Sequence, residues 1–276
     1  MRNDFAAIII SHKRPECSTY RVLRECGYTG KVFVVIDDGD PSKEDYQERY
    51  GDSLRVFHKE VNFDIGDNFD GPNSIATFSR NYCWTVAEDE GLNAFLMLDD
   101  DLEQMSYRYV KDGHLKGKKA QNLDWLFENV YDWLMGSNMG CISFGNAMDY
   151  IGGAERLNRA KRSVMNAFFF KAERRFEFCG RYSEDVISPL IQNKTGNCML
   201  GHTGVQAQFD VWTAGKPTED GGCQSAYKDN SSFTLRFYNI LWNPDCVYLK
   251  YNGAEWIAIT QERYAYPMII SERHRK

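Results

Sequence analysis

The sequence predicts an α/β fold in which helices flank an open, mostly parallel β-sheet. Two observations lead to this prediction. Continuous apolar runs, which suit strands buried on both faces of a parallel sheet, alternate with helical periodicity over residues 1–101. Acidic residues follow two of these runs directly, at the edge where an open α/β sheet places its ligands. No repeat, low-complexity tract or linker interrupts the chain, so we expect one domain over residues 1–276.

The composition fits this class of protein. With 276 residues, a net charge of -6, 43% hydrophobic and 26% charged residues, the chain is ordinary globular protein rather than disordered or fibrous. Its apolar runs fall far short of the roughly 20 residues that span a bilayer. The N-terminal run also ends too early for a secretory core. We therefore expect a cytoplasmic protein without a membrane segment.

The first predicted elements form a strand, helix, strand unit. Residues 5–10 are apolar and β-branched and predict a buried strand. A helix follows, with Pro15 in its first turn and Gly27 just after its end. Residues 31–36 predict a second buried strand, which ends in the acidic segment 37–40.

The next elements complete the first half of the chain. An acidic helical stretch leads to a short strand at residues 54–57 and a polar loop over 62–73. Residues 74–90 predict a helix with apolar residues along one face and Gly91 as its cap. A fourth strand follows at once, over residues 94–98.

The second half alternates less regularly. We expect helices over residues 123–135 and 184–192, the latter with Ser183 as N-cap. Further strands are predicted at 140–144, 164–170 and 205–212, followed by a Gly- and Lys-bearing loop over 215–227.

Eight cysteines are scattered along the chain without any CxxC pair. A chain of this size does not need disulfides to be stable, so we expect reduced and mostly buried thiols. A closed zinc site usually takes two ligands from one tight turn, and the spacing therefore disfavours zinc.

Three consecutive carboxylates, Asp99, Asp100 and Asp101, follow the fourth predicted strand directly. They need either a cation or full solvation, and a divalent metal is the sharper hypothesis. In an extended segment Asp99 and Asp101 would point together and Asp100 away. Such a pair suits Mg²⁺ or Mn²⁺ that also binds a diphosphate. The alternative is a solvated acidic turn.

Four short motifs at successive strand ends or on the intervening helix resemble the GT-A glycosyltransferases with their DxD motif. They are His12-Lys13-Arg14-Pro15, Asp37-Asp38, Ser79-Arg80-Asn81 and Leu98-Asp99-Asp100-Asp101. The resemblance covers about the first half of the chain and implies a GT-A-like, Rossmann-like sheet. It also implies that residues 1–101 bind the nucleotide sugar, while residues 102–276 bind the acceptor and carry catalysis.

The resemblance further implies roles for single residues. Arg14, Asp37 and Asp38 would hold the base and ribose, usually of uridine, in a UDP-sugar co-substrate. The remaining donor contacts would be Arg80, Asn81, Asp99 and Asp100, and Asp101 with Asp99 would bind Mn²⁺ or Mg²⁺. Two alternatives stay open. Arg80 could merely pair with Glu88 or another surface acid, and Asp37 and Asp38 could form an ordinary Asp-rich turn.

Two further motifs lie in the second half. Glu184 and Asp185 resemble the Glu-Asp motif that many inverting GT-A enzymes place at a helix start. A carboxylate there can take the proton of the acceptor hydroxyl, so Asp185 is the candidate general base and Glu184 a sugar or acceptor contact. Acids also favour the first turn of any helix. His202 falls about where this family supplies a third metal ligand, although a lone loop histidine is more often structural.

Basic residues cluster in the second half of this acidic chain. One cluster spans residues 155–181, where phenylalanines that we expect in the core are interleaved, and others lie at 111–119 and 273–276. Such clusters are typical of contacts with a phosphate backbone, although plain solvated faces are more common. The segments 111–119 and 215–227 are candidate loops for presenting a base of DNA.

The whole pattern resembles the TET-associated glycosyltransferases and related bacteriophage DNA-modifying enzymes. This resemblance implies 5-hydroxymethylcytosine in phage DNA as the acceptor, and the host cytoplasm as the location. A glycan or protein acceptor remains an alternative. So do a catalytically silent nucleotide-sugar or DNA-binding module and a nucleotidyltransferase on a similar sheet.

Overall fold

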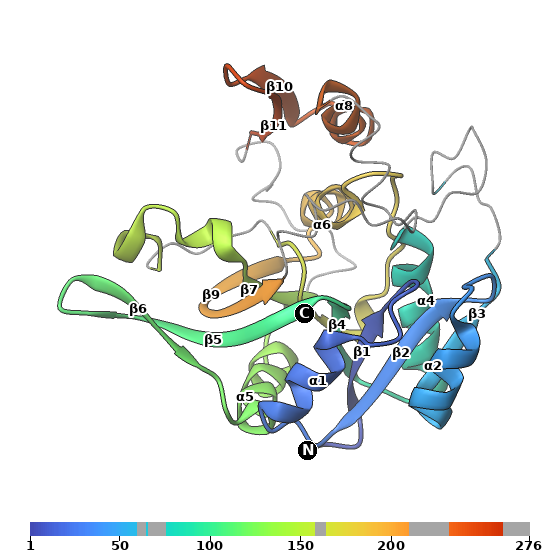
Figure 1. Cartoon of the computed structure of the whole chain (residues 1–276). Coiled ribbons are helices and arrows are strands. Elements are labelled where there is room, and N and C mark those ends of the chain that lie inside the picture. The colour runs from blue at the N-terminus through green and yellow to red at the C-terminus, as the bar shows by residue number, and fades with distance from the viewer. Residues whose placement is uncertain (60–64, 66–75, 158–163, 210–231, 262–276) are drawn as a thin grey trace.

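The structure is a computed structural model that describes residues 1–59, 65, 76–157, 164–209 and 232–261. A nine-stranded sheet lies at its centre, with the strand order β3-β2-β1-β4-β8-β7-β9-β5-β6 (Figure 1). Its strands are β1 (Phe5–Ile10), β2 (Lys31–Asp37), β3 (Leu54–Phe57), β4 (Ala94–Asp99), β5 (Leu102–Lys111), β6 (His114–Lys119), β7 (Cys141–Gly145), β8 (Phe168–Lys171) and β9 (Met199–Phe209).

The helices and a second, two-stranded sheet complete the described part of the chain. The helices are α1 (Ser18–Glu25), α2 (Lys43–Tyr50), α4 (Ala76–Asp89), α5 (Leu123–Met135), α6 (Glu184–Lys194) and α8 (Ser232–Trp242). The second sheet consists of β10 (Val247–Tyr251) and β11 (Trp256–Thr260). None of the described helices is both long and apolar enough to cross a bilayer.

The strand directions correct one expectation. The pairs β2–β3, β1–β2, β1–β4 and β7–β9 are parallel, as predicted for an α/β sheet. The pairs β4–β8, β7–β8, β5–β9 and β5–β6 are antiparallel, so the sheet is mixed rather than mostly parallel. The reason is that an apolar run shows that a strand is buried on both faces, but not the direction in which it runs.

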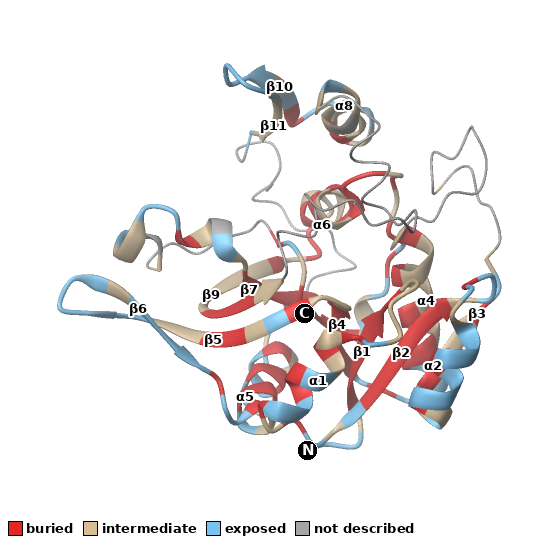
Figure 2. Ribbon diagram, in the orientation of Figure 1, coloured by how far each residue is buried: buried red, intermediate tan, exposed pale blue. Residues whose placement is uncertain are grey.

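Helices pack on both faces of the sheet and bury its apolar residues. On one face, α1, α2 and α5 cover the alternate residues Phe5, Ala7 and Ile9 of β1. On the other face, α4 covers Ala6, Ile8 and Ile10 together with residues of β2, β4 and β8. The predicted core phenylalanines at 168–170 are fully buried, which confirms that expectation. Figure 2 shows the resulting buried centre and the exposed β6 strand.

Several local predictions need correction. Helix α1 begins at Ser18, so Pro15 precedes it rather than occupying its first turn. Ser183 stands at the N-cap position of α6, but its backbone is left-handed (φ 57°) and its side chain makes no capping hydrogen bond. The segment 111–119 is not a loop, because most of it is strand β6. The predicted loop at 215–227 and most of the loop at 62–73 lie outside the described residues.

The basic segment 155–181 is also less uniform than its sequence indicates. Lys171 is buried, and its ammonium donates to the carbonyl of Ser137 at 2.9 Å. Arg175 pairs on the surface with Glu88 at 3.1 Å. Residues 158–163 and 273–276 lie outside the described part of the chain. Of the seven described cysteines, five are buried, in agreement with the sequence.

Candidate active site

The three consecutive carboxylates lie at the C-terminal end of β4, where Asp99 pairs in register with Ile10 of β1. Asp100 and Asp101 form a turn, after which β5 begins at Leu102. We call residues 99–101 the acid turn. Thr19 of α1 fixes its backbone, since its hydroxyl donates to the Asp99 carbonyl (2.5 Å) and accepts from the Leu102 N–H (2.9 Å). Arg14 Nη1 contacts both Asp100 and Asp101, so the expectation that Asp100 points away from Asp101 is wrong.

Arg14, after β1, provides positive charge on one side of the acid turn. Its Nη1 lies 3.2 Å from Asp100 and 3.8 Å from Asp101. The Ser11 hydroxyl also donates to Asp100 at 2.6 Å. Burial nevertheless raises the pKa of the Asp100 carboxyl, and the negative charge of Asp99 raises this pKa as well. The Asp100 carboxyl is thus held by groups of the protein itself.

Asp101 is the most weakly paired of the three acids, because its ion pair with Arg14 is 3.8 Å long, against 3.0 Å for Asp99 with Arg80 and 3.2 Å for Asp100 with Arg14. Burial, together with the adjacent Asp99 and Asp100, raises the pKa of its carboxyl to about 7. A group in this state is stabilised by a further cation, and carboxylate oxygens are the ligands that Mg²⁺ and Mn²⁺ prefer. The ligand atoms of the three acids do not, however, all lie within 4.8 Å of one another, so a metal ion at the acid turn stays a prediction from the sequence.

Arg80 of α4 connects the acid turn to helix α6. Its Nη2 lies 3.0 Å from Asp99 Oδ1, and its Nε donates to Glu184 Oε1 at 3.0 Å. The arginine is 3% exposed. Burial alone would lower the pKa of its guanidinium, but Asp99, Glu184 and Asp185 raise it overall, so Arg80 stays charged. The alternative that Arg80 pairs with Glu88 or another surface acid is wrong, because Arg80 is buried and pairs with Asp99 and Glu184, while Glu88 pairs with Arg175.

The face of α4 that carries Arg80 also holds the segment that leads into α6. Thr77, Arg80 and Asn81 share this face by their helical spacing. The Thr77 hydroxyl donates to the Gly180 carbonyl at 2.7 Å. The Asn81 amide donates to the Phe178 carbonyl (3.0 Å) and accepts from its N–H (2.7 Å). Asn81 thus holds the backbone of Phe178 in the segment that precedes α6.

Glu184 and Asp185 form the first turn of α6, directly after the left-handed Ser183. Such a backbone conformation costs free energy for a residue other than glycine and is common at functional sites. Burial and the adjacent Glu184 raise the pKa of the Asp185 carboxyl to about 7, although Arg80 acts in the opposite direction. A carboxylate with such a pKa is a suitable general base near neutral pH.

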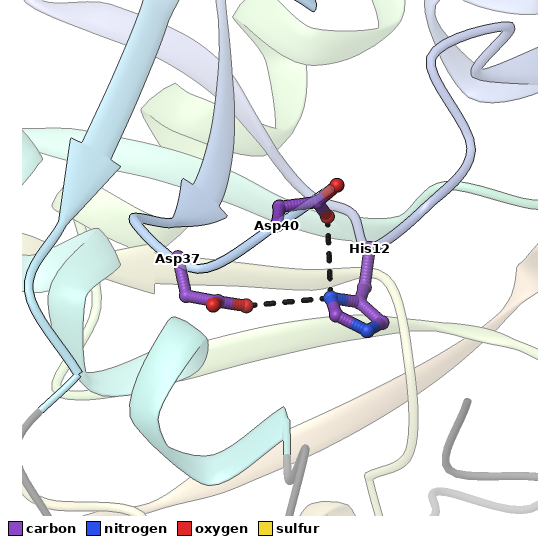
Figure 3. Close-up of side chains that lie close together, drawn as sticks. All are labelled: His12, Asp37 and Asp40. Carbon is purple, nitrogen blue, oxygen red and sulfur yellow. Dashed lines mark ion pairs between the residues drawn. The ribbon is translucent and has the colours of Figure 1, made fainter. Parts of the chain in front are cut away.

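A second charged group, which the sequence did not single out as a unit, lies at the ends of β1 and β2 (Figure 3). His12 Nδ1 lies 3.3 Å from Asp37 Oδ2 and 3.2 Å from Asp40 Oδ2. The ligand atoms of these three residues all lie within 4.8 Å of one another, which is close enough to hold a metal ion. Parallel neighbouring strands end at the same sheet edge, and this rule could have identified His12 and Asp40.

The ion pairs of His12 with Asp37 and Asp40 predict that the stability of the folded protein depends on pH. Asp37 and Asp40 raise the pKa of His12 from 6.5 to about 9. The stabilisation by protonated His12 is therefore complete below about pH 6.5 and is lost as the pH rises through about 9. We expect the free energy of unfolding to fall over this range, and to fall less in His12→Gln. Denaturant titrations of both proteins at several pH values measure this difference, and equal pH slopes would contradict it.

The remaining candidate residues, Asp38 and His202, have partners outside the acid turn. Asp38 is exposed and pairs with His58 Nδ1 at 2.5 Å. The ring of His202, on β9, packs edge-on against Trp133 with the ring centroids 5.4 Å apart. Among the described residues, His202 does not form a three-ligand group with Asp99 and Asp101.

A cavity of about 620 Å³ lies beside the acid turn. Residues 13–18, Arg21 and Glu103 line it together with Asp100 and Asp101. It therefore places Arg14 and two carboxylates on the wall of an open space at the C-terminal edge of the sheet. This is the position at which open α/β sheets bind their ligands.

The comparisons with known proteins identify the family of the chain. An α/β sheet with charged side chains at its C-terminal edge is typical of an enzyme that binds its ligand there. The carboxylates of this edge would accept an anionic ligand only together with cations such as Arg14 or a bound metal ion. A family model described as TET-Associated Glycosyltransferase matches residues 5–206. The match covers most of the chain, which therefore belongs to this family and is a glycosyltransferase of the EC 2.4 class. No curated protein shows significant sequence similarity to the chain.

Proposed function

We propose that this glycosyltransferase is of the GT-A type and transfers a sugar from a UDP-sugar to 5-hydroxymethylcytosine in DNA. The observation that carries the proposal is the position of Arg80 between Asp99 and Glu184. The buried guanidinium of Arg80 thereby pairs both with Asp99, which we propose for donor binding, and with Glu184, which we propose for acceptor binding. The family's association with TET systems, which oxidise 5-methylcytosine, supports the acceptor.

The proposed donor site lies along the C-terminal edge of β1, β2 and β4. Arg14, Asp37 and Asp38 would contact the base and ribose, and Asp99 and Asp100 would face the sugar and diphosphate. Asp101, with Asp99, would hold Mn²⁺ or Mg²⁺, which when bound supplies positive charge against the leaving diphosphate. We propose no metal role for His202, because its ring packs against Trp133.

In the proposed reaction, the acceptor hydroxyl oxygen forms a bond to the anomeric carbon of the sugar. Asp185 takes the hydroxyl proton, and the bond between the sugar and the diphosphate breaks. The nucleoside diphosphate leaves with the electron pair of that bond. Arg80 acts as a positioning residue, since it fixes Asp99 and Glu184 through its two ion pairs.

The acceptor is tested by measuring UDP release in the presence of Mn²⁺ and a panel of acceptors. We expect release to be stimulated by DNA with 5-hydroxymethylcytosine and not by the same DNA with cytosine. If only a glycan or a protein stimulated UDP release, the chain would still be a glycosyltransferase, but DNA would not be its acceptor. Release of pyrophosphate instead of UDP would contradict the proposed reaction.

The proposed role of Asp185 predicts the pH dependence of transfer. The base must be deprotonated, and its pKa is raised to about 7, so the rate should rise with pH through about 7. Asp185→Asn should bind donor normally but lose transfer at every pH. The pH profile of single-turnover transfer, with donor affinity as the control, measures both effects. A wild-type rate that is constant between about pH 5 and pH 8 would remove Asp185 from this role.

A further inference from the structure

The β5–β6 hairpin is an arm that begins directly after the acid turn. Asp112 and Gly113 connect its strands, and both have a positive φ (52° and 74°). This conformation is that of a tight two-residue hairpin turn, whose twist matches that of the strands. Figure 1 shows the hairpin projecting beyond the rest of the sheet. Its first strand has ten residues, so its tip lies roughly 30 Å from the acid turn at about 3.3 Å per residue.

One face of the hairpin packs toward the body of the molecule. Arg108 Nε donates to Gln206 Oε1 at 2.7 Å, and its guanidinium lies 5.1 Å from the Tyr150 ring centroid. Gly117, opposite Arg108 in register, makes room for this arrangement. A Cβ at residue 117 would lie 2.6 Å from Arg108 Nη1. These contacts fix the orientation of the arm.

The other face is basic and aromatic. Opposite residues of an antiparallel pair share a face, and the register pairs Tyr107 with Lys118, Tyr109 with Lys116, and Lys111 with His114. We call these six residues the basic face of the hairpin. None of them is acidic, although the whole chain has a net charge of -6. All of them except Tyr107, which packs partly against the core, are exposed.

We propose that the basic face of the hairpin binds the phosphate backbone of duplex DNA beside the nucleotide that is modified. This inference rests on the proposed DNA acceptor and names the surface that holds it. The major groove of B-DNA admits a two-stranded β-ribbon, and lysines on such a ribbon neutralise phosphates. A reach of roughly 30 Å corresponds to about nine base pairs at 3.4 Å per pair. The hairpin therefore contacts flanking duplex up to about one helical turn from the acid turn.

The test compares two charge-matched double variants. Lys116→Gln/Lys118→Gln removes two cations from the basic face, and Lys43→Gln/Lys250→Gln removes two exposed cations elsewhere. Binding of a fluorescent duplex containing 5-hydroxymethylcytosine is followed by anisotropy between about 50 and 200 mM salt. For the hairpin variant we expect the slope of log affinity against log salt to fall by about 2, since each lost phosphate contact removes about 0.9. The control should keep the wild-type slope.

Duplex length provides a second measurement. For the wild type, shortening the flanking duplex from about 12 to about 4 base pairs should weaken binding at least tenfold, because the distal phosphates are lost. In the hairpin variant, the same shortening of the duplex should weaken binding less. An unchanged salt slope in the hairpin variant, or no binding of duplex by the wild type, would overturn the inference.

Sugar transfer, measured on the same proteins, separates this inference from the proposed function. If the hairpin variant transferred sugar to long duplexes normally and with an unchanged KM, the hairpin would not bind the DNA acceptor. DNA would still be the acceptor of the enzyme. Binding that depends on the hairpin, with no transfer to DNA under any condition, would refute the acceptor while the DNA-binding surface stands.

Discussion

Asp101→Ala is expected to abolish metal-dependent transfer and metal-dependent donor binding. The carboxyl of Asp101 has the longest ion pair of the acid turn, 3.8 Å to Arg14, and its pKa is raised to about 7 by burial and by its two acidic neighbours. A bound cation would relieve this repulsion, and the same cation would offset the charge of the departing diphosphate. Since charge stabilisation by a metal contributes several kcal/mol, we expect turnover to fall at least about a thousandfold.

The control for this variant is Asp132→Ala, which removes an exposed carboxylate from α5. Turnover at several Mn²⁺ concentrations and donor affinity by calorimetry are measured for both variants. The control should behave as the wild type. If Asp101→Ala kept turnover that Mn²⁺ stimulates, the metal would be held elsewhere, and the His12, Asp37 and Asp40 group would be the next site to test.

The second large effect is expected for Arg80→Ala. Its removal would leave Asp99 and Glu184 without the buried guanidinium that pairs with both. Breaking a buried ion pair by removing one partner costs about 3–5 kcal/mol. We therefore expect a marked loss of stability, together with loss of transfer because the two halves of the proposed site are no longer held together.

Arg175→Ala provides the matched control, because Arg175 pairs with Glu88 on the surface. Exposed pairs of this kind contribute about 0–1 kcal/mol. Denaturant unfolding measures the free energy for both variants, and Arg80→Lys tests whether charge alone suffices. Equal stability and equal transfer rates in Arg80→Ala and Arg175→Ala would contradict the bridging role of Arg80.

The sequence predicts the positions of strands well where a continuous apolar run marks a strand that is buried on both faces. The strands at the centre of the sheet, β1, β2 and β4, lie where their apolar runs placed them. The same pattern cannot give strand direction, because residues 168–170 are buried on both faces whether they run parallel or antiparallel. Expecting a mostly parallel sheet was therefore wrong for half of its strand pairs.

The partners of charged residues are harder to predict, because they are distant in sequence. Arg80 and Glu184 are 104 residues apart in the sequence and meet only in the folded chain, and no local pattern shows this. The grouping of His12 with Asp40 was not predicted for a related reason, since each belongs to a short polar segment that resembles an ordinary turn. The hairpin at 102–119 escaped detection because its exposed, lysine-rich second strand lacks apolar alternation.

The most direct test of the proposed function is mass spectrometry of nucleosides from hydroxymethylcytosine DNA. The DNA is incubated with the protein, Mn²⁺ and a panel of UDP-sugars, in parallel with the Asp101→Ala variant. We predict that 5-hydroxymethylcytosine gains the mass of one pentose or hexose with the wild type, and that the variant gives no gain. The absence of any gain with the wild type, without hydrolysis of any donor, would contradict the proposed reaction.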